Sequence, residues 1–569
     1  MAPTTHLTRD ANVSFEEFLH YAKITRAEEM NVPSIERNIK SIFSRKSTKK
    51  PGDGVDSPSS LKTNGPKGEK GPGLIEGPTE DEWTTASRAA RSATWGAVFY
   101  LITTDILGPY SVPGLLAGRS RKWDTDQELL FMPSLRASLS SESSEGVAVG
   151  KSGSDYFSSG FLIWRLFLNL DSHQYPLKTY GDLFFRIYGK VPRYLANTLQ
   201  SIQLVFNVGI IILSNGQGLS QVSSGKVCFS VLCVIWTIAG LLLGQIRTLQ
   251  KYGWVANSAV WINILVIFIT MGVVTHTEPN YTAGLASNNQ PKAPVVHTAG
   301  PPSYSDFPNQ VVGLMQAVFS YGGAMIFCEL MAEMRRPYDF WKGMITAQIL
   351  IFCLYIFFGV YVYGYQGQFA INPAIQGISP YGWQTAMNVL YMVSSLVAAG
   401  LYGNIGIKVL YVNIFQEIFN GPGLNTRAGK LLWVVMVPIY WALAFIIASA
   451  IPQFSALSAI LGASCIMQFT YTFPPLLTLG FAIKQDAILP NETFDPATGH
   501  LINQQDSGLR RWTRGFSKRW PTKILHILYF LGSATTAILG IYSAALGLVS
   551  SYSGVNATSS FGCKSPVGA

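Results

Sequence analysis

The chain has 569 residues, 48% of them hydrophobic and only 13% charged, and its formal net charge is +10. Charged residues at about half the usual share, together with long apolar runs, are typical of proteins that cross the lipid bilayer several times. The basic residues lie mostly in short loops and in the N-terminal region. In such places they orient membrane spans, so the positive charge does not indicate a nucleic-acid partner.

Residues 1–92 are polar and rich in Ser, Pro, Gly and Lys. This composition offers too little apolar surface to support a folded core, so we expect a disordered cytoplasmic tail. A short helix within residues 14–45 is also compatible with the sequence. The first 20 residues lack the apolar core of a cleaved signal peptide, and the first membrane helix is therefore expected to direct targeting.

Residues 93–550 form the predicted transmembrane domain, in which apolar stretches approach the ~20 residues that a helix needs to cross a bilayer. Ten predicted spans are residues 94–116, 195–221, 226–246, 253–275, 308–332, 342–365, 383–406, 431–451, 454–482 and 524–550. An eleventh candidate, residues 157–170, is short and carries Arg165. Only if it spans do the basic residues of later loops fall on the cytoplasmic side, as the positive-inside rule requires. We predict eleven spans, a cytoplasmic N-terminus and a short external tail at residues 551–569.

Residues 117–156 interrupt this pattern with a polar, Ser-rich sequence at the place where a second full span would begin. Two interpretations remain open. The segment is either a large external loop or an error in the predicted coding sequence, such as a retained intron. We favour the second interpretation, which would leave the second span incomplete.

Two predicted spans are interrupted near their centres. The first carries Asp105-Ile-Leu-Gly108-Pro109 followed by Tyr-Ser-Val-Pro113, and the sixth carries Ser320-Tyr-Gly-Gly323. Inside a bilayer, a broken helix is tolerated only where protein or a cavity satisfies the freed backbone groups. Matching breaks in two halves of a membrane protein indicate a transporter's substrate site. The pair therefore predicts that a small molecule is moved across a membrane, whereas either break alone would be equally compatible with an ordinary kink.

Three segments resemble the amino acid/auxin permease family, most closely its fungal neutral amino acid permeases. They are TWGAVFYLITTDILGPYSVP at 94–113, TYGDLFFRIYG at 179–189 and SYGGAMIFCELMAEMRRPYDFWKGM at 320–344. The resemblance covers roughly residues 80–550 without 117–156. It implies an all-α fold of two inverted five-helix repeats plus an extra C-terminal helix, like that of the bacterial leucine transporter. The broken spans one and six would begin the two repeats, and the substrate would be an amino acid, often driven by protons.

An amino acid presents a carboxylate and an ammonium to its carrier. Free N–H groups at a helix N-terminus suit the carboxylate, and free carbonyl groups suit the ammonium. The predicted substrate-binding residues are Ile106, Gly108, Tyr110 and Ser111 in the first break and Ser320, Tyr321 and Gly322 in the second.

Asp105 and Glu329 are the candidates for proton coupling or gating. Asp105 lies in mid-span, where an ionisable group costs ~2.5–3.5 kcal/mol. It would carry the coupled proton or pair with the substrate ammonium, unless it is a neutral structural acid. Glu329, with Glu333 and two arginines (335–336) nearby, would form an inner gate closed by ion pairs, or else a solvated helix end. Sodium coupling, through Ser394 and Ser395, is the less favoured alternative.

The sequence lacks a GxxxxGK[ST] loop, a GxSxG elbow and an HExxH motif, so neither an ATP-driven pump nor a hydrolase is expected. It also lacks a Cys/His cluster, and we expect no enzyme activity, no cofactor, no metal and no disulfide framework. The predicted function is proton-coupled symport of neutral amino acids by alternating access, in the plasma membrane rather than the vacuolar membrane. The alternatives are a non-transporting amino acid sensor, which would signal through the tail, and a vacuolar exporter.

Overall fold

The computed structural model describes residues 13–31, 91–110, 159–246, 252–297, 307–553 and 559–567, with short gaps at 92, 107, 109, 289, 417–418, 420, 423–425, 497 and 499. The insert at 117–156 and Ser111 lie outside the described residues. So does most of the predicted tail.

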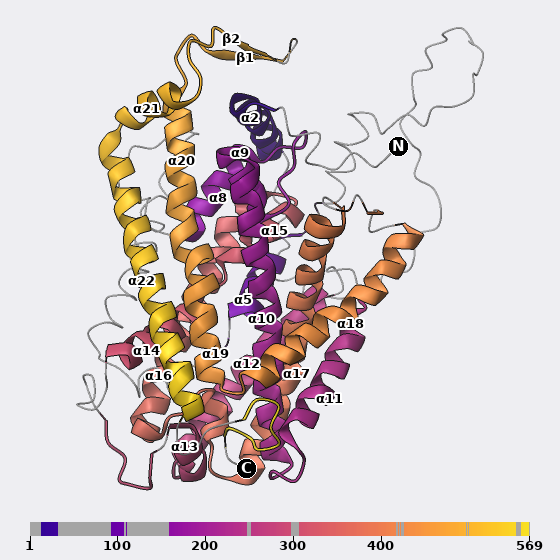
Figure 1. The fold of residues 1–569 in the computed structure, drawn as a ribbon, viewed down its shortest axis with the longest axis vertical. Coiled ribbons are helices and arrows are strands. Elements are labelled where there is room, and N and C mark those ends of the chain that lie inside the picture. The colour runs from indigo at the N-terminus through magenta and orange to yellow at the C-terminus, as the bar shows by residue number, and fades with distance from the viewer. Residues whose placement is uncertain are drawn as a thin grey trace.

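Helices follow one another along the described chain and form an elongated bundle (Figure 1). Those within predicted spans are α5 (Trp95–Ile106), α8 (Ser159–Leu170), α10 (Lys190–Val222), α11 (Phe229–Gly244), α12 (Tyr252–Val274), α14 (Phe307–Tyr321), α15 (Phe327–Glu333), α16 (Phe340–Gln366), α17 (Tyr381–Leu410), α18 (Arg427–Ala450), α19 (Phe454–Leu461), α20 (Phe473–Ala487) and α22 (Trp520–Ser553). The others are α2 (Phe15–Asn31), α9 (Tyr180–Tyr188), α13 (Tyr281–Asn288) and α21 (Leu509–Ser517), with one antiparallel hairpin of β1 (Thr493–Asp495) and β2 (His500–Ile502).

The described part of the chain has 8 helices long and apolar enough to cross a membrane. The shorter apolar helices α8 and α11 have 12 and 16 residues. Each of the eleven predicted spans contains a helix, and the predicted all-α, multi-span architecture is confirmed. The number of membrane crossings and the inverted repeats stay predictions.

The long helix α10 runs through the middle of the bundle and packs against α9, α11, α17 and α18 (Figure 1). Its inward face is unusually polar for a membrane helix, with buried Gln and Asn side chains. Buried polar groups in hydrocarbon need partners, so they occur where protein or a polar site supplies them. This face of α10 therefore marks the polar interior of the bundle.

The predicted tenth span is not one regular helix. Between α19 and α20 the chain forms two π-helical segments, η8 (Gly462–Ile466) and η9 (Gln468–Thr472). π-helical turns within α-helices are rare and often mark functional sites. Here η8 packs against α14, which leads into the second predicted break.

Residues 15–31 of the predicted disordered tail form the helix α2, within the range 14–45 in which a short helix was compatible with the sequence. One face of this helix is apolar, and Phe15, Phe18 and Ala22 are buried against the bundle. Tyr175 is 5.4 Å from Phe18, measured between ring centroids. The average composition of residues 1–92 is polar, and it does not reveal that this one stretch carries an apolar face.

A disulfide joins Cys228 to Cys563, which corrects the expectation that no disulfide is formed. The backbone supports the pairing, since Phe229 N–H donates to the Cys563 carbonyl at 3.0 Å. The two cysteines lie 335 residues apart, too far for spacing to indicate their contact. Disulfides persist in oxidising compartments, so this end of the bundle is expected to face away from the cytosol. It lies opposite the end that carries α2 and α21 (Figure 1).

Changing Cys563 to Ser should free the thiol of Cys228 for reaction. A membrane-impermeant maleimide added to intact cells should then label the variant, whereas the disulfide protects Cys228 in the unmodified chain. Labelling would be read after a Cys353→Ser change in both proteins, because Cys353 is an exposed free thiol. Labelling only after the cells are opened would contradict the assignment of this end to the outside.

Candidate functional site

The two predicted breaks meet at one side chain, Tyr355 of α16. The Gly108 N–H donates to the Tyr355 hydroxyl oxygen at 3.0 Å, and that hydroxyl donates to the Ser320 carbonyl at 3.2 Å. Tyr355 is only 1% exposed. The structure therefore brings Gly108 and Ser320, predicted on opposite sides of a substrate, to within reach of a single oxygen atom.

Aromatic rings surround this meeting point. Tyr110, also predicted as a site residue, packs edge-on against Tyr391 and Phe358, with ring centroids 5.2 and 6.0 Å away. Tyr321, another predicted residue, lies 5.0 Å from Tyr355, again measured between ring centroids. The surroundings of the two breaks are thus largely apolar, with hydroxyl groups at a few positions.

Neutral polar side chains from α10, α12 and α17 complete the site. The Tyr110 hydroxyl donates to Asn263 Oδ1 at 3.4 Å, and the Ser214 and Tyr391 hydroxyls lie 3.1 Å apart. Ser395 donates to Asn215 Oδ1 at 2.9 Å. In the structure, Ser395 is therefore engaged with α10.

Ser394 donates to the Ala259 carbonyl at 3.3 Å, and so it too has a protein partner. Groups of acidic, Cys or His side chains able to hold a metal ion are absent from the residues that the structure describes.

At the second break, Gly322 packs closely against Ile466. Between α14 and the 3₁₀ turn η3 (Ala324–Ile326), a β-carbon on Gly322 would lie 2.0 Å from Cγ2 of Ile466 in the π segment η8. Ser320, at the end of α14, turns its hydroxyl back to the Gln316 carbonyl at 2.9 Å. Close packing against Ile466 therefore favours glycine at 322.

The first break is described only in part. Asp105 and Ile106 belong to the last turn of α5, but their side chains lie outside the described residues. Their predicted roles stay predictions.

Glu329 lies on α15, facing α9 and α10. Its carboxylate accepts hydrogen bonds from Gln200 Nε2 at 2.7 Å and from the Tyr180 N–H at 3.4 Å. Arg336, one of the two arginines proposed for the inner gate, pairs instead with Asp339 at 3.5 Å. Within the described residues, Glu329 has neutral partners and no ion pair. The role of Glu329 in proton coupling or in a gate therefore stays a prediction.

Sequence reasoning missed Tyr355, Asn263 and Gln200. Each is a single neutral residue in an apolar span. No pattern among its neighbours in the sequence distinguishes it from a residue that serves only in packing. A weak indication was available for Gln200, because a glutamine inside a membrane helix needs a partner.

Comparison with known proteins identifies the family. Residues 156–492, more than half of the chain, match the family described as "Transmembrane amino acid transporter protein". The chain belongs to this family. The match confirms the resemblance seen in the sequence, and it begins after the first broken span.

Curated relatives of this chain include two fungal proteins. A "Transmembrane transporter" of Gibberella moniliformis is 25% identical over 303 residues, 52% of this chain and 61% of the relative. An "N amino acid transport system protein" of Neurospora crassa is 23% identical over 306 residues, 52% of this chain and 62% of the relative. The matched region thus spans about three fifths of the relatives' length.

Among solved structures, a nucleobase-cation-symport-1 family transporter, in a closed conformation with bromovinylhydantoin bound, aligns with a TM-score of 0.38 and 12% identity. The alignment covers 81% of this chain and 92% of that one. A TM-score at this level adds nothing to the family assignment.

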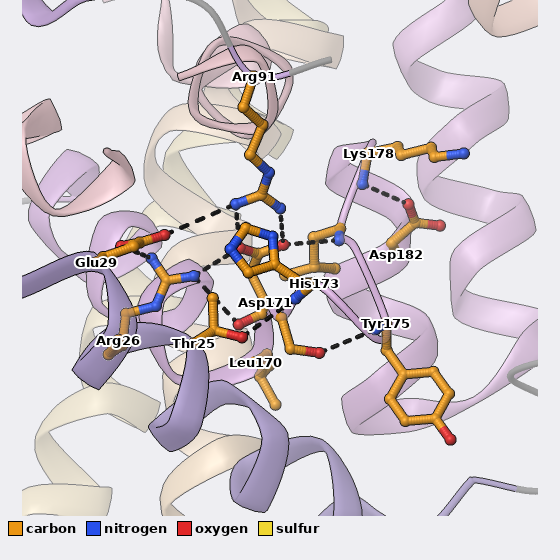
Figure 2. A network of polar contacts seen from close by, with 12 residues as sticks. Thr25, Arg26, Glu29, Arg91, Leu170, Asp171, His173, Tyr175, Lys178 and Asp182 are labelled. Atoms are coloured by element: carbon orange, nitrogen blue, oxygen red, sulfur yellow. Dashed lines mark hydrogen bonds and ion pairs between the residues drawn. The ribbon is translucent and has the colours of Figure 1, made fainter. Parts of the chain in front are cut away.

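At the α2 end of the bundle, a buried ion cluster joins three separate segments (Figure 2). Asp171, after α8, is fully buried and accepts from Arg91 Nη1 and Nη2 at 2.9 and 2.7 Å. Arg26 of α2 pairs with the same carboxylate at 2.7 Å, and Glu29 pairs with Arg26 at 2.7 Å. The cluster therefore holds α2, the chain that precedes α5 and the end of α8 together.

Burial and charge oppose each other in this cluster. Burial alone would favour the neutral form of Asp171, but Arg91 and Arg26 outweigh it and hold the pKa of Asp171 below its usual range. For Glu29 burial is the larger effect, and it raises the pKa to about 7 against the opposing influence of Arg26. Asp171 is therefore the fixed negative charge of the cluster.

The segment around Ala93 connects the start of the first broken span to the end of the sixth. Ala93 pairs with the chain at Met334, since the Ala93 N–H donates to the Glu333 carbonyl at 2.9 Å and the Arg335 N–H donates to the Ala93 carbonyl at 2.9 Å. The start of the first broken span is thus tied to the end of the sixth. Arg91 lies two residues before Ala93, and its ion pair with Asp171 links this bridge to the buried ion cluster.

At the opposite end, the 3₁₀ turn η6 (Ala374–Gly377) is buried between α10 and α17. The Gln376 carbonyl accepts from Gln221 Nε2 and Gln384 Nε2, both at 3.0 Å. The Gln376 side chain donates to the Ser214 carbonyl at 3.0 Å, one hydrogen bond away from Tyr391. Gln376 therefore links η6 to both α10 and α17.

Proposed function

We propose that this transporter carries neutral amino acids by alternating access and binds them between the two broken spans. The observation that carries the proposal is the convergence of the Gly108 N–H and the Ser320 carbonyl on one oxygen atom. A carboxylate accepts from backbone N–H groups, and an ammonium donates to carbonyls. An amino acid can make both contacts at once because its two charged groups share one carbon.

The lining supports a neutral side chain on the substrate. Around the two breaks, the described side chains are tyrosines, a phenylalanine, serines and asparagines, all uncharged. A charged substrate side chain would need a fixed counter-charge in so apolar a site. Aromatic and hydroxyl groups suit substrates with apolar or small polar side chains.

The coupling ion is proposed to be the proton. Asp105 and Glu329 are the ionisable groups predicted on the broken spans, and Glu329 is held by neutral partners that allow it to ionise or take up a proton. The disulfide end faces outward in this proposal, which leaves the N-terminus cytoplasmic and fits the plasma membrane.

Changing Asp105 to Asn should abolish the pH dependence of uptake while leaving the amount of protein at the cell surface unchanged. An amide cannot release a proton, so the cycle would lose its coupling step. Initial uptake rates at pH 5 and pH 7 for surface-matched cells measure this effect. Unchanged pH dependence would exclude the proton role for Asp105.

The function itself is tested by expression in a permease-deficient yeast strain. Uptake of labelled neutral amino acids should be higher at external pH 5 than at pH 7, and an uncoupler should abolish the difference. No uptake from protein present at the surface would contradict the proposal.

The docked helix α2 favours one second candidate, an amino acid sensor whose tail reports on the state of the bundle. A sensor, once purified, would bind amino acids but would not transport them.

A fluorescent tag separates the plasma-membrane importer from a vacuolar exporter, because the exporter would be found on the vacuole.

A further inference from the structure

We infer that the Tyr355 hydroxyl takes the place of the substrate in the empty transporter, and that it allows the empty carrier to reorient. The inference rests on the proposed function, because it names the groups that an amino acid would occupy. It assigns Tyr355 as a positioning residue of the transport cycle.

The physical reason lies in the chemistry of a hydroxyl. A tyrosine oxygen can accept one hydrogen bond while its own hydrogen is donated to another group. Tyr355 does both, accepting from Gly108 N–H at 3.0 Å and donating to the Ser320 carbonyl at 3.2 Å. The substrate carboxylate would make the first contact and the substrate ammonium the second. One atom of the protein thus reproduces both polar ends of an amino acid.

An empty site at membrane depth needs such a partner. Backbone groups freed by a broken helix have no water to bond to in the bilayer core, and leaving them unpaired is costly. Tyr355 is 1% exposed, and its ring packs against Tyr321 of the second break at 5.0 Å. The ring is therefore held where its hydroxyl can bridge the breaks until a substrate displaces it.

The consequence concerns only one half of the transport cycle. Net uptake requires the carrier to return empty, whereas exchange of labelled for unlabelled substrate uses the loaded carrier in both directions. Without the hydroxyl, the empty carrier would have two unsatisfied backbone groups, but the loaded carrier would have its substrate. Loss of the hydroxyl should therefore slow net uptake and spare exchange.

The test uses Tyr355→Phe, which removes the oxygen and keeps the ring. The purified full-length protein would be reconstituted into liposomes under a proton gradient, and net uptake and exchange of one labelled neutral amino acid would be measured. Net uptake should fall by about tenfold or more, as expected when a buried hydrogen bond is lost at the limiting step. Exchange should stay within about twofold of the unmodified protein.

Tyr361→Phe is the matched control, because Tyr361 lies on the same helix and its ring packs against Phe357 and Tyr365. It should leave both rates unchanged. Substrate binding to detergent-purified protein gives a readout independent of flux. Tyr355→Phe should bind the substrate at least as tightly as the unmodified chain, because an internal competitor has been removed.

Equal losses of net uptake and exchange, or weaker substrate binding by Tyr355→Phe, would overturn the inference. Failure of the proposed function would look different, since the unmodified protein would then show neither uptake nor exchange.

Discussion

Changing Asp171 to Asn should destabilise the protein by roughly 3–5 kcal/mol, the usual cost of removing one partner from a buried ion pair. Asp171 is the carboxylate that receives both Arg91 and Arg26 at 2.7 Å, and the Arg91 side chain is only 4% exposed. An amide has the same shape, but it removes the negative charge that the two guanidinium groups share and leaves Glu29 as the carboxylate beside them. The loss of stability should be fully present at neutral pH, because there the Asp171 carboxyl of the unmodified protein is ionised. Neutral pH lies above both the unfolded pKa and the lowered folded pKa of this group.

Thermal unfolding of the purified protein in detergent measures the loss of stability, and limited proteolysis locates it. The variant should be cleaved within α2 under conditions that leave the unmodified protein intact, because Arg26 is one of the contacts that hold this helix. Glu278→Gln is the matched control. Its partner Lys292 is 3.9 Å away and both side chains are more than two thirds exposed, so little change is expected. Equal stability of the Asp171 variant and this control would show that the cluster contributes nothing net.

Changing Gly322 to Val should reduce uptake by more than about tenfold, since overpacking a tight contact typically costs 1–3 kcal/mol and a larger side chain costs more. Even the first added carbon would lie 2.0 Å from Ile466 Cγ2 and 3.1 Å from the Val318 carbonyl oxygen. The chain at the second break would have to move, and with it the Ser320 carbonyl two residues earlier. Initial uptake rates, normalised to surface protein, measure the effect.

Two variants sharpen this prediction. Gly322→Ala combined with Ile466→Ala should recover part of the uptake that Gly322→Ala alone loses, because the double change makes room for the added carbon. Gly272→Ala is the control, since its added carbon would meet no atom within 4 Å. No recovery in the double variant would indicate that the Val318 backbone, and not the Ile466 side chain, sets the limit.

The candidate site could be predicted in part, because its breaks are encoded locally. Pro109 lacks a backbone donor and Gly322 lacks a side chain, and each disturbs a helix whatever surrounds it. Those properties indicated Gly108, Tyr110, Ser320 and Tyr321, which the structure places around Tyr355 and Tyr391, and their part in substrate binding stays a prediction. The partner between the breaks was missed because Tyr355 lies 247 residues beyond Gly108.

The sequence by itself indicated a helical membrane protein of many spans, and it predicted which two of those spans are broken. Those properties follow from the length, hydrophobicity and helix-breaking residues of single segments, which act over a few neighbours. Only the tertiary structure decided which distant groups meet, such as Arg91 with Asp171 and Cys228 with Cys563. It also decided that α2 docks on the bundle. Such contacts depend on how whole helices pack in three dimensions, and no local pattern of residues contains that arrangement.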